Sequence, residues 1–265
     1  RGRMNTSNFI EHLLNQLGQG LLGQEALIKM VVVAVLARGH VLLEGTPGLG
    51  KTELVKNLGR LLGLQTRRIQ FTADLLPTDI TGSMVLEETD RQRTFRFHPG
   101  PLFGNVILAD EINRASPRTQ SALLEGMQEG HVTVLGETHA LPDPFWVLAT
   151  QNPIEQEGTF PLPEAQLDRF LFKLNVQRVG MAVLQEIVSG KSQPAQQPLS
   201  TDPAVIKKLF EDTEKVFLAR ALAGYIARLV DATHPDSPAC PSALKPYIRL
   251  GSSPRGAISI GRAAR

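Results

Sequence analysis

The residues best suited to chemistry form one glycine-rich run, Gly45-Thr-Pro-Gly-Leu-Gly-Lys-Thr52. The run matches every fixed position of the pattern G-x-x-x-x-G-K-[ST]. Glycines let successive backbone N–H groups turn inward around an anion, and the positive end of a following helix adds to the attraction. In this pattern Lys51 bridges β- and γ-phosphates, and Thr52 ligates Mg²⁺. The run therefore predicts a site for a nucleoside triphosphate, ATP, with magnesium. We expect its residues to line the nucleotide together: Gly45, Thr46, Pro47, Gly48, Leu49, Gly50, Lys51 and Thr52.

A second candidate is the apolar run Val106-Ile-Leu-Ala that ends in Asp110-Glu111. A buried strand here would deliver both carboxylates to the edge of a parallel sheet where ligands bind. We expect Asp110 to hold the magnesium ion through water and Glu111 to polarise the attacking water. A hydrophobic run followed by Asp-Glu is weak alone, because helix caps often look similar. Its position downstream of the glycine-rich run, together with the strand pattern, makes it strong evidence for a nucleotide site.

Three further polar residues allow two interpretations each. Asn152 ends another apolar run and could orient a water near the γ-phosphate, or belong to an ordinary Asn-Pro turn. Arg169, in Leu-Asp-Arg-Phe, is on its own pattern typical of a surface residue. Arg255 follows Ser253-Pro254, which suits a helix start, but the arginine alone indicates little.

Apolar periodicity predicts the elements that must position these residues. Continuous apolar runs predict buried strands, and apolar residues three and four apart predict helices. Strands alternating with helices indicate an α/β fold around a parallel sheet. Two polar stretches with β-like pieces, 83–97 and 131–141, predict hairpins. The expected strands are 40–43, 68–71, 105–109, 145–150 and 170–176, and the expected helices are 8–17, 24–36, 51–62 and 116–129.

The composition changes after Val176. Residues 193–202 form a linker rich in Pro, Gln and Ser, and helices are expected at 203–217, 221–233 and from Gly256 onward. We therefore predict an α/β nucleotide-binding domain over 1–177 and a small helical domain over 178–265.

Composition excludes several classes of function. The net charge of only +2 disfavours a nucleic-acid partner. The histidines lack metal-ligand spacing, and the single cysteine, Cys240, has no partner for a disulfide or zinc site. Reducing surroundings fit this cysteine usage, and we expect a cytoplasmic location. The longest apolar run, Val31–Ala37, is far shorter than the about 20 residues of a membrane span, so no membrane segment is expected.

These segments together resemble the MoxR family of AAA+ ATPases. The likeness extends from about Gly39 to Leu174, through GHVLLEGTPGLGKT, RIQFTADLLPTDITG, NVILADEINRASPRTQSALLEGMQEGHVTV and FWVLATQNPIEQEGTFPLPEAQLDRFLFKL, and resumes at LGSSPRGAISIGRAAR. It implies an AAA+ core of five parallel strands followed by a helical lid. It further implies that the two hairpins are the helix-2 insert and the pre-sensor hairpin.

The resemblance also implies roles for the three ambiguous residues. Asn152 corresponds to sensor 1, Arg169 to the arginine finger that reaches the ATP of a neighbouring subunit, and Arg255 to sensor 2 on the lid. Such a trans arginine stabilises transition-state charge and ties hydrolysis to assembly. A ring-forming homo-oligomer, a hexamer, is expected, as is a chaperone-like role in complex assembly, maturation or metal insertion beside a partner with a von Willebrand A domain.

Two departures from the family pattern concern the lid. Relatives continue well past the residue that matches Arg255, so the lid is expected to be incomplete at the C-terminus. Residues 177–180, Gln-Arg-Val-Gly, lack the Pro-and-acidic start expected there. The two departures affect the surfaces through which the lid would dock on the core, and therefore also the expected role of Arg255.

Two other functions stay open at this point. A non-hydrolysing nucleotide switch, or an inactive truncated module, would fit the short C-terminus. A nucleic-acid motor would fit the broader relatives, although the charge disfavours it.

Overall fold

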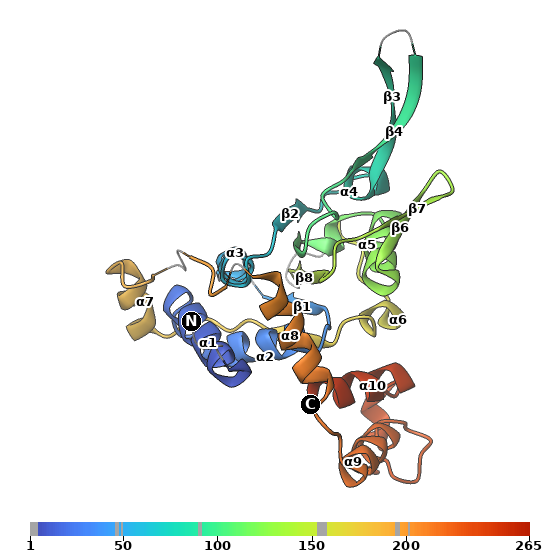
Figure 1. Ribbon diagram of the computed structural model, residues 1–265. Coiled ribbons are helices and arrows are strands. Elements are labelled where there is room, and N and C mark those ends of the chain that lie inside the picture. Colours follow the sequence, from blue (N-terminus) through green and yellow to red (C-terminus); the bar gives the residue numbers. More distant parts are fainter. Residues whose placement is uncertain are drawn as a thin grey trace.

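The computed structural model describes residues 5–45, 48, 50–89, 92–152, 158–193, 197–200 and 202–265. Its centre is a parallel sheet with the strand order β2-β5-β8-β1-β9 (Figure 1). The strands expected from the sequence are found within a few residues of their predicted bounds, so the predicted α/β class is confirmed. They are β1 (Val41–Glu44), β2 (Thr66–Gln70), β5 (Val106–Asp110), β8 (Trp146–Gln151) and β9 (Phe172–Asn175).

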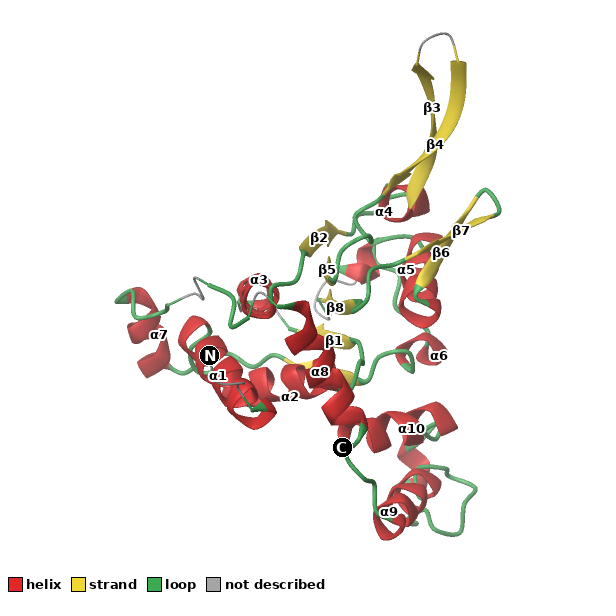
Figure 2. Cartoon of the chain, in the orientation of Figure 1, coloured by secondary structure: helices red, strands yellow, loops and turns green. Residues whose placement is uncertain are grey.

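Helices cover both faces of this sheet (Figure 2). Because successive side chains of a strand point to opposite faces, Val41 and Leu43 enter one apolar cluster while Leu42 enters the other. The first cluster lies under α1 (Thr6–Gly20), α2 (Glu25–Leu36), α3 (Lys51–Leu62) and α8 (Pro203–Glu214). The second lies under α4 (Pro77–Thr81) and α5 (Pro117–Glu129). Burial on both faces explains why β1, β5 and β8 are nearly continuous apolar runs.

Strand register brings the polar ends of the strands to one edge. Gln70 of β2 pairs with Asp110 of β5, and Glu44 of β1 pairs with Gln151 of β8. All pairs in this sheet are parallel, so these C-terminal residues gather at the same edge.

Two hairpins project from the body, as the sequence predicts (Figure 1). The longer pairs β3 (Gly82–Thr89) with β4 (Gln92–Pro99), and the shorter pairs β6 (His131–Val134) with β7 (Glu137–Ala140). Phe97 of the long hairpin stacks on His139 of the short one at 3.7 Å between ring centroids. The hairpins are therefore joined at their bases.

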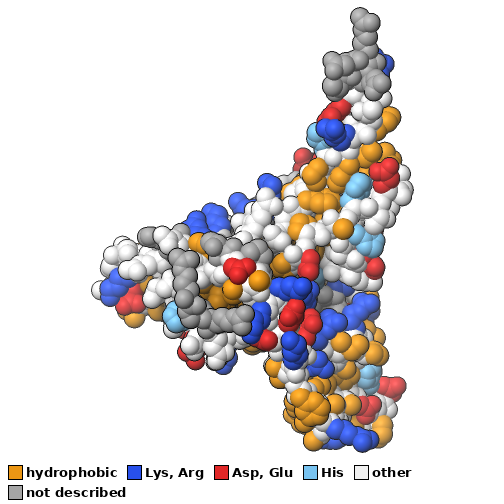
Figure 3. Space-filling view, in the orientation of Figure 1, with side chains coloured by type: hydrophobic (Ala, Val, Ile, Leu, Met, Phe, Trp, Pro, Cys, Tyr) orange, Lys and Arg blue, Asp and Glu red, His pale blue; other side chains and the backbone are white. Residues whose placement is uncertain are grey.

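The C-terminal part contains one helix that the sequence analysis did not predict, α7 (Met181–Val188). The other C-terminal elements are α9 (Arg220–Asp231) and α10 (Pro254–Ala263), which pack on each other, and a short 3₁₀ turn η2 (Lys245–Tyr247). Hydrophobic side chains gather over α9 and α10, where Tyr225 and Ile258 are exposed (Figure 3). No helix among the described residues has both the length and the apolar character that crossing a membrane requires.

Helix α8 packs with the α/β core. Leu209 and Phe210 are buried in the first cluster, and the guanidinium of Arg38 lies 4.8 Å from the centroid of the Phe210 ring. The division into domains at residue 177 stays a prediction. The packing adds that α8, which follows that division, shares the apolar cluster of α1–α3.

Phe210→Ala tests this packing. Because the ring is buried at the centre of the contact, we expect the free energy of unfolding to fall by about 3–5 kcal/mol. Phe217→Ala is the matched control, since Phe217 is 85% exposed, and should change it by about 0.5 kcal/mol or less. Urea denaturation followed by circular dichroism measures both. Equal stabilities would contradict the assignment of α8 to the core.

Candidate functional site

A cavity of about 350 Å³ opens at the C-terminal edge of the sheet. It lies between the glycine-rich run after β1, the first turn of α3 and the ends of β2, β5 and β8. We call it the P-loop cavity, and the described residues that line it are Gly45, Gly48, Gly50, Lys51, Thr52, Glu53, Arg68, Gln70, Asp110, Glu111 and Asn152.

Backbone geometry explains the glycines of the run. Gly48 and Gly50 have φ values of +84° and +79°, which residues with a side chain rarely adopt. A Cβ atom at Gly50 would also collide with the side chain of Leu21. Gly50 directly precedes α3, so these positions direct the chain into the helix that starts at Lys51. Thr46, Pro47 and Leu49, expected in the same site, lie outside the described residues.

Lys51 lies over the glycine-rich run. Its ammonium donates to the carbonyl oxygen of Gly45 at 2.9 Å. Burial lowers the pKa of Lys51, and the nearby carboxylates of Asp110 and Glu111 oppose that shift. The ammonium of Lys51 therefore lies near the N-terminus of α3, close to the carboxylates of Asp110 and Glu111.

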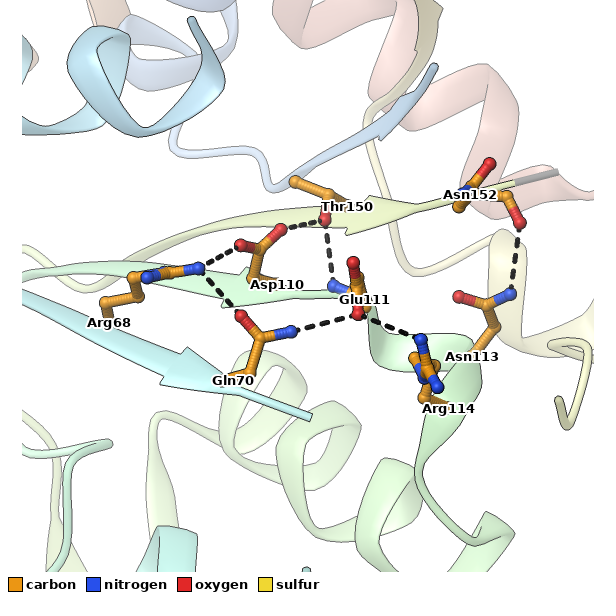
Figure 4. A network of polar contacts seen from close by, with 8 residues as sticks. All are labelled: Arg68, Gln70, Asp110, Glu111, Asn113, Arg114, Thr150 and Asn152. Carbon is orange, nitrogen blue, oxygen red and sulfur yellow. Dashed lines mark hydrogen bonds and ion pairs between the residues drawn. The ribbon is translucent and has the colours of Figure 1, made fainter. Parts of the chain in front are cut away.

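The hydroxyl of Thr150 joins the two carboxylate residues (Figure 4). Thr150 is 1% exposed, and its Oγ1 accepts the backbone N–H of Glu111 at 2.9 Å. The same hydroxyl donates to Oδ1 of Asp110 at 2.6 Å. Since one contact uses a lone pair of the hydroxyl and the other its proton, the hydroxyl has a fixed orientation.

Two residues of β2 complete this network. Arg68 Nη2 donates to Oδ2 of Asp110 and to Oε1 of Gln70, each at 2.7 Å. Gln70 Nε2 then donates to Oε2 of Glu111 at 3.0 Å (Figure 4). Sequence reasoning missed Arg68, Gln70 and Thr150. The alternation of side chains along β2 and β8 could have indicated which residues share a face, but not their partners.

Glu111 adopts a left-handed backbone, with φ of +57°. A non-glycine residue there costs on the order of 1 kcal/mol or more, and such residues gather at functional sites. Arg114, in the 3₁₀ turn η1 (Ile112–Arg114), lies 3.7 Å from the carboxylate oxygen that Gln70 contacts. The turn of the chain at Glu111 thus aims its side chain into the cavity and not along the strand.

Asn152 follows β8 and lines the P-loop cavity. It is 8% exposed, and its carbonyl oxygen accepts from Nδ2 of Asn113 at 3.4 Å. Asn113 itself is fixed by the chain around Phe160, whose N–H donates to the carbonyl oxygen of Asn113 at 2.6 Å.

The two candidate arginines lie outside the P-loop cavity of their own chain. Arg169 comes just after α6 (Glu164–Leu167) and donates to Gln166 Oε1 at 2.7 Å, to the carbonyl oxygen of Leu124 at 3.3 Å and to Gln128. Arg255 is exposed in the first turn of α10. The structure therefore gathers Lys51, Thr52, Asp110, Glu111 and Asn152 and leaves both arginines apart from them.

Comparison with known proteins identifies the family. Residues 40–172 match the sequence profile of the "ATPase family associated with various cellular activities (AAA)". The chain is 43% identical over 259 residues to "Chaperone MoxR1" of Mycobacterium tuberculosis, an alignment that covers 97% of this chain and 68% of that protein. The chain belongs to the MoxR family of AAA+ ATPases.

Two further matches cover nearly the whole chain. The uncharacterized Bacillus subtilis protein YeaC is 44% identical over 262 residues, which cover 97% of this chain and 76% of YeaC. A solved structure from Cytophaga hutchinsonii, described as a candidate ATPase, superposes with a TM-score of 0.85 at 39% identity. The superposition covers 97% of this chain and 78% of the Cytophaga hutchinsonii chain. The fold of this solved structure is thus shared along nearly the whole chain.

The residues present fit a magnesium ion bound together with a nucleotide. The hydroxyl of Thr52 and the carboxylate of Asp110 line the same cavity, and Mg²⁺ prefers such oxygen ligands. No cluster of three or more His, Cys, Asp or Glu side chains suited to a metal ion occurs in the described ranges. Magnesium sites of nucleotide enzymes do not need one, because substrate phosphates and water complete the shell.

Thr150→Val tests the central hydroxyl. Valine has a similar shape but leaves a buried N–H and a carboxylate without their partner. We therefore expect the free energy of unfolding to fall by about 2–3 kcal/mol. Thr150→Ser keeps the hydroxyl and should lose less than half as much. Urea denaturation compares the variants, and equal losses in the two would show that the hydrogen bonds contribute little.

Proposed function

We propose that this MoxR-family chain binds ATP with Mg²⁺ in the P-loop cavity and hydrolyses the terminal phosphate. One observation carries the proposal: Asp110 and Glu111, which lie far along the sequence from Lys51, line a single cavity with the glycine-rich run. A nest of backbone N–H groups, a cation and a carboxylate base are the parts that phosphoryl transfer to water requires.

Each group has a task that follows from its position. The backbone N–H groups of the glycine-rich run and the ammonium of Lys51 bind the phosphates and stabilise the charge that develops on them. Magnesium, when bound at Thr52 and Asp110, supplies further neutralisation of phosphate charge. Glu111 accepts a proton from the attacking water, and Asn152 orients that water. The network around Thr150 keeps Asp110 and Glu111 in fixed, different directions.

Arg169 supports a site that is shared between protomers. Its side chain is held at α5 and α6, away from the cavity of its own chain. We therefore propose that it reaches the nucleotide of a neighbour in a ring, a hexamer. The role of Arg255 as a sensor on the lid is part of the same proposal.

The wider role is also a proposal. The name of one relative, "Chaperone MoxR1", supports a chaperone-like factor. From the family resemblance we propose that this factor acts in the assembly, maturation or metal insertion of a protein complex. We propose a partner with a von Willebrand A domain from the family resemblance, and a cytoplasmic location from the single cysteine. A non-hydrolysing switch is the second candidate, since cavity geometry supports nucleotide binding independently of turnover.

Glu111→Gln separates binding from hydrolysis. The amide keeps the size of the side chain but cannot accept the proton, so phosphate release should fall by about 10²–10⁴-fold. Affinity for a fluorescent ADP analogue should change by less than about threefold, because ADP does not need the base. Glu137→Gln, at the exposed hairpin β6–β7, is the control and should keep full turnover. A wild-type protein that binds the analogue yet releases no phosphate would favour the switch.

Mixing two inactive variants tests the shared site. Arg169→Ala should lower turnover by about 10³-fold if it supplies the finger. In a mixture with Glu111→Gln, some interfaces pair an intact Glu111 with an intact Arg169 from the neighbour. Phosphate release should therefore rise well above that of either variant alone. If the mixture stays as inactive as its components, Arg169 does not act on a neighbouring protomer.

A further inference from the structure

Arg68 lies where a divalent cation and a protein side chain would meet the same carboxylate. Along β2 the side chains of Ile69 and Phe71 enter the second apolar cluster, so Arg68 and Gln70 face the other side of the strand. Gln70 pairs with Asp110 in the sheet, and Arg68, two residues earlier, reaches along the strand to it. Arg68 Nη2 lies 2.7 Å from Oδ2 of Asp110 (Figure 4).

This contact gives Asp110 two donors, one on each oxygen. Thr150 donates to Oδ1 and Arg68 to Oδ2. The hydroxyl is neutral, but the guanidinium of an arginine carries a permanent positive charge. The Asp110 side chain is 19% exposed, so its ion pair with Arg68 is screened less than a surface pair. The negative charge that would attract a cation to Asp110 is therefore already partly balanced.

We infer that Arg68 sets the divalent-cation affinity of the nucleotide site by competing for the charge of Asp110, an inference that rests on the proposed function. Arg68 acts through Asp110 and is a positioning residue. Its presence lowers the affinity for the metal, so that the cation binds well only when the phosphates of a nucleotide add their own negative charge. Occupancy of the metal site is thereby linked to that of the nucleotide site.

The cavity offers the displaced guanidinium a second position. Arg68 is 54% exposed on a flexible stem, so it can move without disturbing the core. Glu53, in the first turn of α3, lines the same cavity, and its exposed carboxylate has a long contact of 3.5 Å with Lys56. Gln70 also holds Arg68 independently of Asp110. Gln70 would therefore still accept from Arg68 after the guanidinium had left Asp110.

Manganese binding to the ADP complex tests the inference without any turnover. Mn²⁺ replaces Mg²⁺, and free Mn²⁺ is counted by electron paramagnetic resonance during titration. Arg68→Gln should bind Mn²⁺ about tenfold more tightly than wild type, as expected for removing one charge about 6 Å from a divalent ion in a water-like dielectric. Arg68→Lys keeps the charge and should stay within about twofold of wild type.

Arg67→Gln is the matched control. Arg67 precedes Arg68 on the same strand and is exposed, but its stem lies beside Gly104 on the opposite face. The substitution removes the same charge from the protein without touching Asp110, so its Mn²⁺ affinity should equal that of wild type. If Arg67→Gln raised the Mn²⁺ affinity as much as Arg68→Gln does, the effect would come from the net charge of the protein. That result would overturn the inference.

Other results of the titrations would overturn the inference or the proposed function. Unchanged Mn²⁺ affinity in Arg68→Gln overturns the inference while leaving the proposed function intact. Weaker Mn²⁺ binding, or weaker ADP binding in the presence of a chelator, would mean that Arg68 assists the nucleotide, which also overturns it. Failure of the wild-type chain to bind ADP with Mn²⁺ would refute the proposed function itself. Arg68→Ala repeats the test should Arg68→Gln fold poorly, as judged by thermal unfolding.

Discussion

Two hydrogen bonds of the Thr150 hydroxyl hold the carboxylate residues of the site in place. The hydroxyl accepts the N–H of Glu111 and donates to the carboxylate of Asp110, so one buried group fixes two consecutive residues that point differently. That contact exists because β5 and β8 pair in parallel, with Ala109 opposite Ala149. A shift of one residue in this register would turn Thr150 to the other face of the sheet. The stability of the sheet and the geometry of the site thus have the same origin.

Charge compensation is the second property of the P-loop cavity. Two of its carboxylates, Asp110 and Glu111, each accept hydrogen bonds from neighbouring side chains, and Lys51 lies near both. A cavity that contains paired charges in fixed positions needs little rearrangement when a charged ligand enters, which is the condition for electrostatic catalysis. The same pairing makes each member sensitive to its partner. Arg68 therefore belongs with Asp110 in any account of the metal site, although it stands on another strand.

The segment that carries Arg169 is connected to the C-terminal helix α10 through its neighbour Asp168. Arg169 follows Asp168, whose carboxylate accepts a hydrogen bond from the hydroxyl of Ser253 at the start of α10. Ser253 also caps that helix by accepting the N–H of Arg255 at 3.1 Å. The segments that carry Arg169 and Arg255 are thus tied to each other within one chain. Movement of α10 would therefore change the surroundings of Asp168, the residue beside the arginine that we propose reaches a neighbouring nucleotide.

The parts of this protein that depend on local sequence pattern could be predicted before the structure was known. The glycine run from Gly45, the strand that ends at Asp110 and the α/β class could be predicted, because backbone freedom and apolar periodicity are properties of neighbouring residues. Which side chains contact one another in the site is known only from the tertiary structure. Arg68, Gln70 and Thr150 meet Asp110 and Glu111 through strand pairing, which a single sequence does not record. The position of α8 in the core was likewise hidden, since burial depends on what a helix packs against.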